Sequence, residues 1–157
     1  MHNITPFLWF DTQAKEAADF YVSLFPDAEL LDVSYYGSET PDEPGSIMSV
    51  TFRLRNLTFT ALNGGPAYEF TPAVSFLVDC ETQEEVDHLW DKLSEGGKAM
   101  QCGWVSDKFN LTWQIIPTIL MELMGDEDEE KASRVTRAMM TMGKIDIQGL
   151  KDAYDGK

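Results

Sequence analysis

Hydrophobic and polar positions along the chain follow one plan twice. In the first half, a short apolar run over Ile4–Phe10 precedes a stretch with apolar residues at helical spacing, and Pro26 ends that stretch. In the second half Phe76 matches Phe7, and the helical spacing returns at an offset of 69 residues. The matching helical positions are Ala17, Phe20, Tyr21 and Leu24 in the first half and Val86, Leu89, Trp90 and Leu93 in the second. The pattern indicates an internal duplication.

A second short match supports the duplication. The sequence Asn-Leu-Thr-Phe over Asn56–Phe59 recurs as Asn-Leu-Thr-Trp over Asn110–Trp113, at an offset of 54 because the first half carries an additional loop over Gly37–Gly45. The second helix is expected to begin after Thr82, which forms a capping-box pattern with Glu85. We expect it to end at the glycine pair that follows Glu95.

The remaining segments alternate between apolar and polar residues, which is typical of strands with one buried face. Each half therefore predicts a strand, a helix and two or three further strands. The expected strands are Leu31–Tyr35, Met48–Leu54, Leu57–Leu62, Ala73–Asp79, Lys98–Cys102 and Leu111–Ile116, with Gly103–Val105 as a further strand or a turn. After Pro117 the tail predicts helices over Thr118–Met124, Glu129–Met142 and Asp146–Tyr154.

Composition narrows the classes of partner. The 157 residues include 12 basic and 27 acidic side chains, a net charge of −15, which argues against nucleic acid and against an anionic membrane surface. The chain has neither an apolar run long enough to cross a membrane nor a basic and apolar leader. Two cysteines, Cys80 and Cys102, make no disulfide framework. We expect a cytoplasmic protein.

Several stretches together resemble a known family. They are Ile4–Phe10, Asn63–Pro66, Phe70–Phe76, Gln101–Trp104, Asp107–Gln114 and, in the tail, Ala138–Ile147. As a set they resemble the PhnB-like branch of the glyoxalase/bleomycin-resistance/dioxygenase group, the vicinal oxygen chelate superfamily. That branch is often labelled demethylubiquinone methyltransferase-like. Asn110 stands where the branch usually has glycine, and Asn tolerates the left-handed backbone conformation that this turn needs.

The resemblance implies an α+β fold. Two βαβββ modules, residues 1–66 and 67–117, would form a curved mixed sheet around a concave pocket, followed by a helical tail over residues 118–157. The whole chain would be a single domain, 1–157. The resemblance also implies a homodimer, because relatives often form one.

In the superfamily, enzymes hold a metal ion with one ligand on the first strand and one on the last strand of each module. Carried over, the last-strand positions are Gln114 and Thr60, and the first-strand positions fall within Ile4–Pro6 and Ala73–Ser75. None of these positions carries His, Asp, Glu or Cys. Because a divalent cation normally requires carboxylate or imidazole ligands, we expect the metal site to be lost.

Our first functional hypothesis is a metal-independent protein that binds a small, partly aromatic or apolar metabolite in the concavity, with no cofactor. The candidate ligand-binding residues are Trp9, Thr60, Asn63, Trp104, Trp113 and Gln114. The alternative is a metal-dependent enzyme of the glyoxalase or dioxygenase kind, with unusual ligands such as Gln114, His2 and groups of a partner subunit. The sequence leaves open whether any reaction is catalysed.

Other residues carry weaker signals for chemistry. A methyl-donor site commonly uses a glycine-rich turn between strand and helix, whereas the first turn here reads Asp11-Thr12-Gln13. Cys102 is a conceivable nucleophile, but no histidine is placed to serve it, and an unreactive thiol is the alternative. Met139, Met140 and Met142 pack in the tail or form a dimer contact or a lid.

Overall fold

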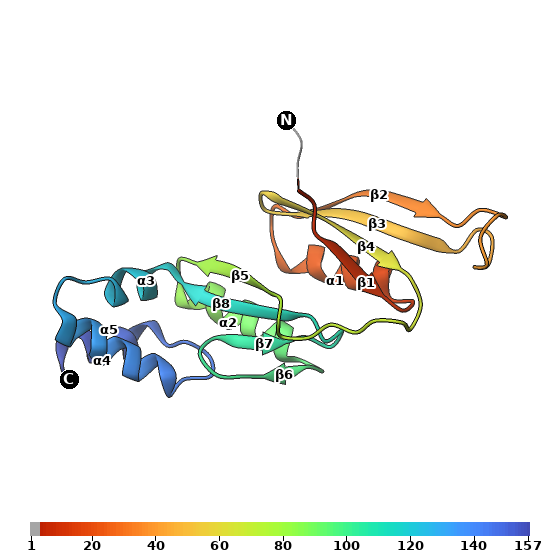
Figure 1. Ribbon diagram of the computed structural model, residues 1–157. Coiled ribbons are helices and arrows are strands. Elements are labelled where there is room, and N and C mark those ends of the chain that lie inside the picture. Colours follow the sequence, from red (N-terminus) through yellow and green to blue (C-terminus); the bar gives the residue numbers. More distant parts are fainter. Residues whose placement is uncertain (1–3) are drawn as a thin grey trace. The chain divides into compact units, whose positions relative to one another are not determined.

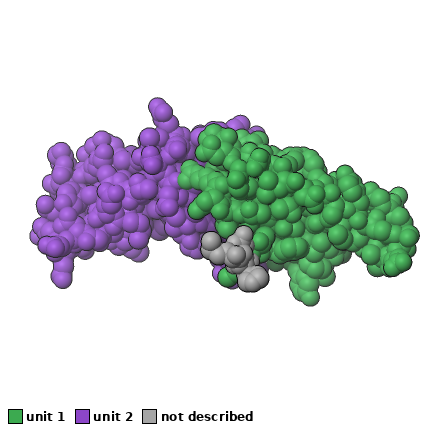
Figure 2. Space-filling view, turned by 90° about the horizontal axis from the view of Figure 1, so that it is seen from above, with its two compact units in different colours: residues 1–69 green, residues 70–157 purple. Residues whose placement is uncertain are grey.

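The computed structural model describes residues 4–157, and the chain forms two compact units, Met1–Glu69 and Phe70–Lys157 (Figure 2). The first unit holds the first βαβββ module. Its sheet has the order β1-β4-β3-β2, in which β1 runs parallel to β4 and the other pairs are antiparallel (Figure 1). The elements are β1 (Phe7–Phe10), α1 (Ala14–Leu24), β2 (Glu29–Tyr35), β3 (Ile47–Leu54) and β4 (Leu57–Asn63).

The second unit repeats this topology and adds the tail. Its sheet has the order β5-β8-β7-β6, again with one parallel pair, β5 and β8. The module consists of β5 (Ser75–Cys80), α2 (Gln83–Ser94), β6 (Lys98–Ala99), β7 (Trp104–Ser106) and β8 (Thr112–Pro117). The tail consists of α3 (Thr118–Met124), α4 (Glu129–Met140) and α5 (Ile147–Asp155). The α+β fold with two βαβββ modules and a helical tail is confirmed, and each module has a four-stranded sheet of its own.

In each module one face of the sheet packs against the helix of the same module. In the first, Tyr21 of α1 and the strand residues Val50, Phe52 and Ala61 are fully buried. In the second, the corresponding layer is formed by Val86 and Leu93 of α2 with Val105 and Ile115 of the sheet, all fully buried. The other face of each sheet carries both polar and apolar side chains, among them Trp9 and Thr60 in the first module and Trp104 and Gln114 in the second.

The tail has a small apolar core of its own within the second unit. Its buried members are Ile116, Leu120, Val135, Ile145 and Leu150. Met139 and Met142 pack against this cluster, whereas Met140 is exposed. Of the three methionines that the sequence analysis singled out, Met139 and Met142 therefore contribute to packing in the tail.

Strand register refines the duplication. Leu8 pairs with Ala61 and Val78 pairs with Ile115; Ala61 and Ile115 are 54 positions apart, whereas Leu8 and Val78 are 70 apart. The strand offset is thus 70 rather than 69, and Phe7 corresponds to Leu77 instead of Phe76. The helices keep the offset of 69, since buried Tyr21 and Leu24 correspond to buried Trp90 and Leu93. The turn before α1 is one residue longer than the turn before α2.

Two predictions from local sequence patterns, the start of α2 and the turn at Asn110, were confirmed. The Thr82 hydroxyl accepts from the Glu85 N–H at 3.2 Å, while the Glu85 carboxylate accepts from the Glu81 N–H at 2.6 Å. Asn110 adopts a left-handed conformation with φ of 67°. By contrast, β6 ends at Ala99 rather than at Cys102, because Cys102 and the glycine after it turn with positive φ.

Candidate functional site

The second sheet presents a row of three side chains on the face away from α2. Leu77 on β5 pairs with Gln114 on β8, and Gln114 pairs with Trp104 on β7. Directly paired residues point to the same face of a sheet, so the three side chains lie next to one another. Leu77 is 50% exposed, and Gln114 and Trp104 are half-buried. The row places one amide between two apolar surfaces.

Gln114 is held in place on one side only. Its Nε2 donates a hydrogen bond to the Ser75 hydroxyl at 2.8 Å. Among the residues that the structure describes, none donates to its carbonyl oxygen. The Gln114 side chain is thus oriented by Ser75 while its acceptor remains available to a ligand.

Thr112 lies on the same face, two residues before Gln114. It is paired in register with Ser75 and with Ser106. Its side chain is fully buried, and its hydroxyl has no hydrogen-bond partner within the described part of the chain. An unsatisfied buried hydroxyl is uncommon because it loses its hydrogen bonds to water without replacement. The Thr112 hydroxyl is therefore a cost to stability and not a group that a ligand can reach.

Trp113 points the other way. It is 2% exposed, and its indole N–H donates to Asp107 Oδ2 at 2.9 Å. Asp107 is itself buried, and its Oδ1 accepts from the backbone N–H groups of Phe109 and Leu111 at 2.8 and 3.0 Å. Asp107, the first residue of the Asp107–Gln114 stretch, thus shapes the turn between β7 and β8. Trp113 therefore lies on the face of the sheet opposite to Gln114.

In the first module, Trp9 and Thr60 lie on the face of the sheet that points away from α1, which we call the open face, as we do for the corresponding face of the second module. Trp9 donates its indole N–H to the carbonyl oxygen of Gly65 at 2.9 Å and packs edge-on against Tyr68, with ring centroids 5.1 Å apart. A Cβ at Gly64 would lie 2.4 Å from the Trp9 ring, so the segment after β4 needs glycine there. Thr60 is 8% exposed, and its hydroxyl lies 3.3 Å from that of Thr51. Both site candidates already have intramolecular partners.

Asn63 lies at the end of β4 on the side of α1. Its Oδ1 accepts from the Ala14 N–H at 2.8 Å, and its Nδ2 donates to the Ile47 carbonyl oxygen at 3.1 Å. The residue before α1, Gln13, makes no side-chain cap. Asn63 therefore supplies the missing cap from a distant strand, a role that local sequence patterns do not reveal.

Within residues 4–157, a cleft of moderate size is found in each unit. The cleft of the first unit, about 400 Å³, is lined by Asp11, Thr12, Lys15, Tyr36, Asp42, Ser46, Ile47, Asn63 and Gly65. The pKa of Tyr36 is raised by burial and by the negative charge of Asp42. The cleft of the second unit, about 540 Å³, is lined by Lys98, Ala99, Met100, Gln101, Cys102 and Trp104. Trp104 belongs both to this cleft and to the row with Gln114.

The positions equivalent to the superfamily's metal ligands carry neutral groups. With the register found above, Thr5 corresponds to Ser75, and Thr60 corresponds to Gln114. Among residues 4–157 no three His, Cys, Asp or Glu side chains gather in a way that could hold a metal ion. His2 lies outside the described residues, and His88 is exposed on α2. This donor set does not fit a divalent cation, which requires negative or imidazole ligands.

No helix within residues 4–157 has both the length and the apolar character that a membrane crossing requires.

Comparisons with known proteins agree with this geometry. The profile of the family described as 3-demethylubiquinone-9 3-methyltransferase matches residues 2–116. The PhnB protein from Bacillus cereus is 33% identical, with a TM-score of 0.68 over 74% of this chain and 100% of that one. A search of curated proteins finds no match.

Two more distant structures share the fold. Protein PA1353 from Pseudomonas aeruginosa is 21% identical, with a TM-score of 0.62 over 74% of this chain and 98% of that one. The fosfomycin resistance protein FosX from Listeria monocytogenes is 15% identical, with a TM-score of 0.50 over 78% of this chain and 97% of that one. The family profile ends before α3, so it does not include the tail stretch that the sequence resemblance covered. The chain belongs to the PhnB-like family of the vicinal oxygen chelate superfamily, the family described as 3-demethylubiquinone-9 3-methyltransferase.

Proposed function

We propose that the protein binds a small, neutral, partly aromatic molecule on the open face of the second module, without a metal ion. Trp104 and Leu77 contact the flat apolar part of the ligand, and the Gln114 carbonyl oxygen accepts a hydrogen bond from it. The observation that carries this proposal is the available acceptor of Gln114 between two apolar side chains. A few well-placed polar groups among apolar ones are typical of small-molecule sites.

The neutrality of the surroundings supports a neutral ligand. Ser75, Thr112 and Ser106 occupy the adjacent row, so six neighbouring positions on this face carry no charge. A charged ligand group placed against these six residues would lose its hydration at a cost, and the charged side chains of the same face, Asp79 and Lys98, occupy the next positions outward on β5 and β6. The second module is a better site than the first, because Trp9 and Thr60 already bond within their own module.

The family description names a methyl transfer, which the local geometry does not support. The turns before α1 and α2 contain no glycine, so neither offers the close backbone approach of a common methyl-donor site. At the start of α1, the Ala14 N–H is already bonded to Asn63. We therefore assign binding rather than methyl transfer.

A matched pair of probes tests the site. 1-Naphthol offers a flat apolar body and one O–H donor, whereas 1-methoxynaphthalene has the same body without the donor. We expect wild-type protein to bind 1-naphthol about fivefold more tightly in a calorimetric titration, the value of one net hydrogen bond. Gln114→Met should remove this preference while retaining similar volume, and Trp104→Leu should weaken both probes.

His88→Gln on the exposed face of α2 serves as the control and should leave both affinities unchanged. Failure of 1-naphthol to bind wild-type protein, or a preference that persists in Gln114→Met, would contradict the proposal. The metal-independent part is tested by metal analysis of protein purified without chelators. Near-stoichiometric zinc, nickel, manganese or iron that disappears in Gln114→Ala would favour the enzymatic alternative.

We further propose that the chain acts as a homodimer, as the resemblance suggests, and that it is located in the cytoplasm, as Cys80 and Cys102, which are not joined in a disulfide, suggest. Sedimentation equilibrium of the same samples measures the assembly state. A monomer at micromolar concentration would contradict this part of the proposal and leave the binding experiment intact.

A further inference from the structure

The segment between α4 and α5 binds the turn that precedes Trp104. The carbonyl oxygens of Met142 and Gly143 accept hydrogen bonds from the backbone N–H groups of Cys102 and Gly103, both at 2.8 Å. We call this segment, Met142–Ile145, the strap. Two adjacent backbone groups of the turn are thus attached to a part of the chain about forty residues away in sequence.

The turn itself is clamped between the strap and β8. Cys102 and Gly103 have φ of 59° and 78°, and a Cβ at Gly103 would lie 2.8 Å from the Ile115 carbonyl oxygen and 3.1 Å from Ile145 Cγ1. The Gly103 carbonyl oxygen accepts from the Ile115 N–H at 2.8 Å. Gly103 therefore links the strap directly to the residue that follows Gln114.

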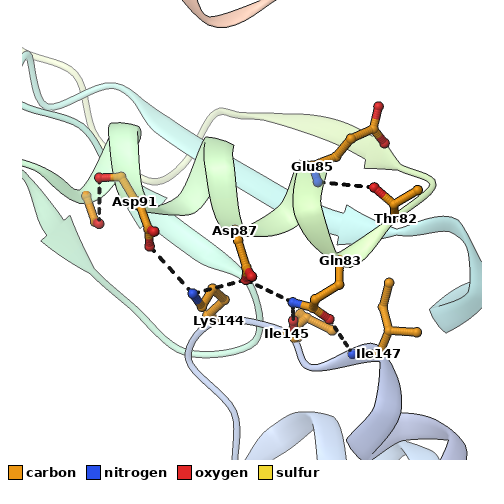
Figure 3. A network of polar contacts seen from close by, with 9 residues as sticks. Thr82, Gln83, Glu85, Asp87, Asp91, Lys144, Ile145 and Ile147 are labelled. Atoms are coloured by element: carbon orange, nitrogen blue, oxygen red, sulfur yellow. Dashed lines mark hydrogen bonds and ion pairs between the residues drawn. The ribbon is translucent and has the colours of Figure 1, made fainter.

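Helix α2 fixes the strap through one amide side chain. The Gln83 Nε2 donates to the Ile145 carbonyl oxygen at 3.1 Å, and its Oε1 accepts from the Ile147 N–H at 2.8 Å (Figure 3). One side chain thus holds the backbone on both sides of Asp146. Because Gln83 also donates to Asp87 at 3.0 Å, its amide is fixed in orientation.

An ionic contact fixes the strap at the next turn of α2. Lys144 Nζ lies 3.0 Å from Asp87 Oδ1 and 3.5 Å from Asp91 Oδ1, and Figure 3 shows both carboxylates pointing toward the ammonium group. Ile145, the next residue, is fully buried in the tail core. Polar contacts with α2 and the burial of Ile145 therefore hold the strap in one position against the Cys102–Gly103 turn.

We propose that the strap is a positioning element for the ligand site of the second module, and that Gln83 and Lys144 are its positioning residues. This inference rests on the proposed function, since it concerns the affinity of that same site. When the strap loosens, the Cys102–Gly103 turn loses two backbone hydrogen bonds, and Trp104 is no longer held beside Gln114. The family profile ends at residue 116, so the strap lies outside the residues that the profile matches, although it belongs to the tail stretch Ala138–Ile147 that resembles the branch.

Hydrogen exchange without any ligand tests whether the strap fixes the Cys102–Gly103 turn. In the double variant Gln83→Ala/Lys144→Met we expect the amides of Cys102 and Gly103 to exchange about tenfold faster, while β5 amides keep their rates. Lys144→Arg should behave like wild type. The matched control is Lys15→Met, which removes an ion pair of 2.6 Å between Lys15 and Asp19 on the helix of the first module.

Affinity for 1-naphthol tests the functional part. We expect it to fall about fivefold in the double variant and to stay unchanged in Lys144→Arg and Lys15→Met. Faster exchange at Cys102 and Gly103 with unchanged affinity would overturn the positioning role. Uniformly faster exchange across β5 would overturn it too, because it would indicate general destabilisation of the unit.

Unchanged exchange in the double variant would show that the contacts with α2 do not hold the turn. If 1-naphthol fails to bind wild-type protein, the proposed function fails. The exchange rates at Cys102 and Gly103 then still decide whether the strap fixes the turn. Lys144→Met alone provides a milder variant if the double variant does not fold.

Discussion

The two modules share one topology but stabilise the connection before their third strand in different ways. In the first, β2 and β3 are seven and eight residues long, and the loop between them is largely exposed. In the second, β6 and β7 have only two and three residues, and the strap bonds to their turn. A long hairpin can hold its own register through many ladder bonds, whereas a short one requires support from another segment.

The same contrast recurs at the next turn. Leu54, at the end of β3, is buried among apolar side chains and precedes a two-residue turn. By register its counterpart is Asp107, which is also buried but accepts two hydrogen bonds from the backbone of a longer turn and one from the Trp113 indole on β8. Equivalent positions of a duplicated fold can thus be stabilised by burial in one copy and by hydrogen bonding in the other.

The largest expected effect comes from removing that hydrogen bonding. Asp107→Leu, which imitates Leu54, should lower the free energy of unfolding by about 4 kcal/mol, because it leaves two buried donors and one part-buried donor without an acceptor. Leu54→Val should cost only about 1 kcal/mol, since one methylene is lost from an apolar contact. Urea denaturation of both variants measures the difference. Equal costs would show that Asp107 acts by volume alone.

A smaller effect is expected from glycine substitutions in the two connections, the one between β6 and β7 and the one between β2 and β3. Gly103→Ala should destabilise by about 3 kcal/mol, because its Cβ meets the Ile115 carbonyl oxygen and side chains of the tail core in addition to the strain of positive φ. Gly45→Ala, with φ of 84° and no atom within 4 Å of the new Cβ, should cost about 1 kcal/mol for strain alone. Thermal unfolding checks both. Similar shifts for the two variants would mean that the strap exerts no steric control over Gly103.

The smallest effect has the opposite sign. Thr112→Val should stabilise the protein by about 1 kcal/mol, because it removes a buried hydroxyl without a hydrogen-bond partner while keeping the shape of the side chain. Its counterpart in the first module, Thr58, is half-buried, so Thr58→Val should change little. The denaturation midpoints of the two variants, each compared with wild type, measure the difference. A loss of stability in Thr112→Val would indicate a bonded water at this hydroxyl.

The sequence was sufficient for the elements and for the topology of the repeat. Alternation and helical spacing predicted every helix and nearly every strand, and the Thr82–Glu85 pair predicted the start of α2. Such signals are local, so they can be read without knowing what packs where. The alignment of the two modules was less certain: a match by residue type aligned Phe7 with Phe76, whereas the strand registers make Phe7 the counterpart of Leu77, because the turn before α1 is one residue longer.

The site was harder to predict for physical reasons. Strict alternation along β8 already separates Gln114 from Trp113, but residue size favoured Trp113 as a ligand contact although it faces the core. The cap that Asn63 provides for α1 joins residues 49 positions apart, and no local pattern signals it. The same holds for Gln83, whose partners Ile145 and Ile147 lie in the tail, more than sixty positions away in sequence. Long-range polar contacts require the folded chain.

The hydrogen bonds from Met142 and Gly143 to the Cys102–Gly103 turn also bear on where this protein can be shortened. A truncated chain that stops where the family profile stops, at residue 116, would leave two backbone amides of the turn unpaired. It would also expose Ile116, which is 4% accessible in the whole chain. Family boundaries and folding boundaries do not coincide in this chain, so fragments for crystallisation or for domain exchange should carry the sequence through α5.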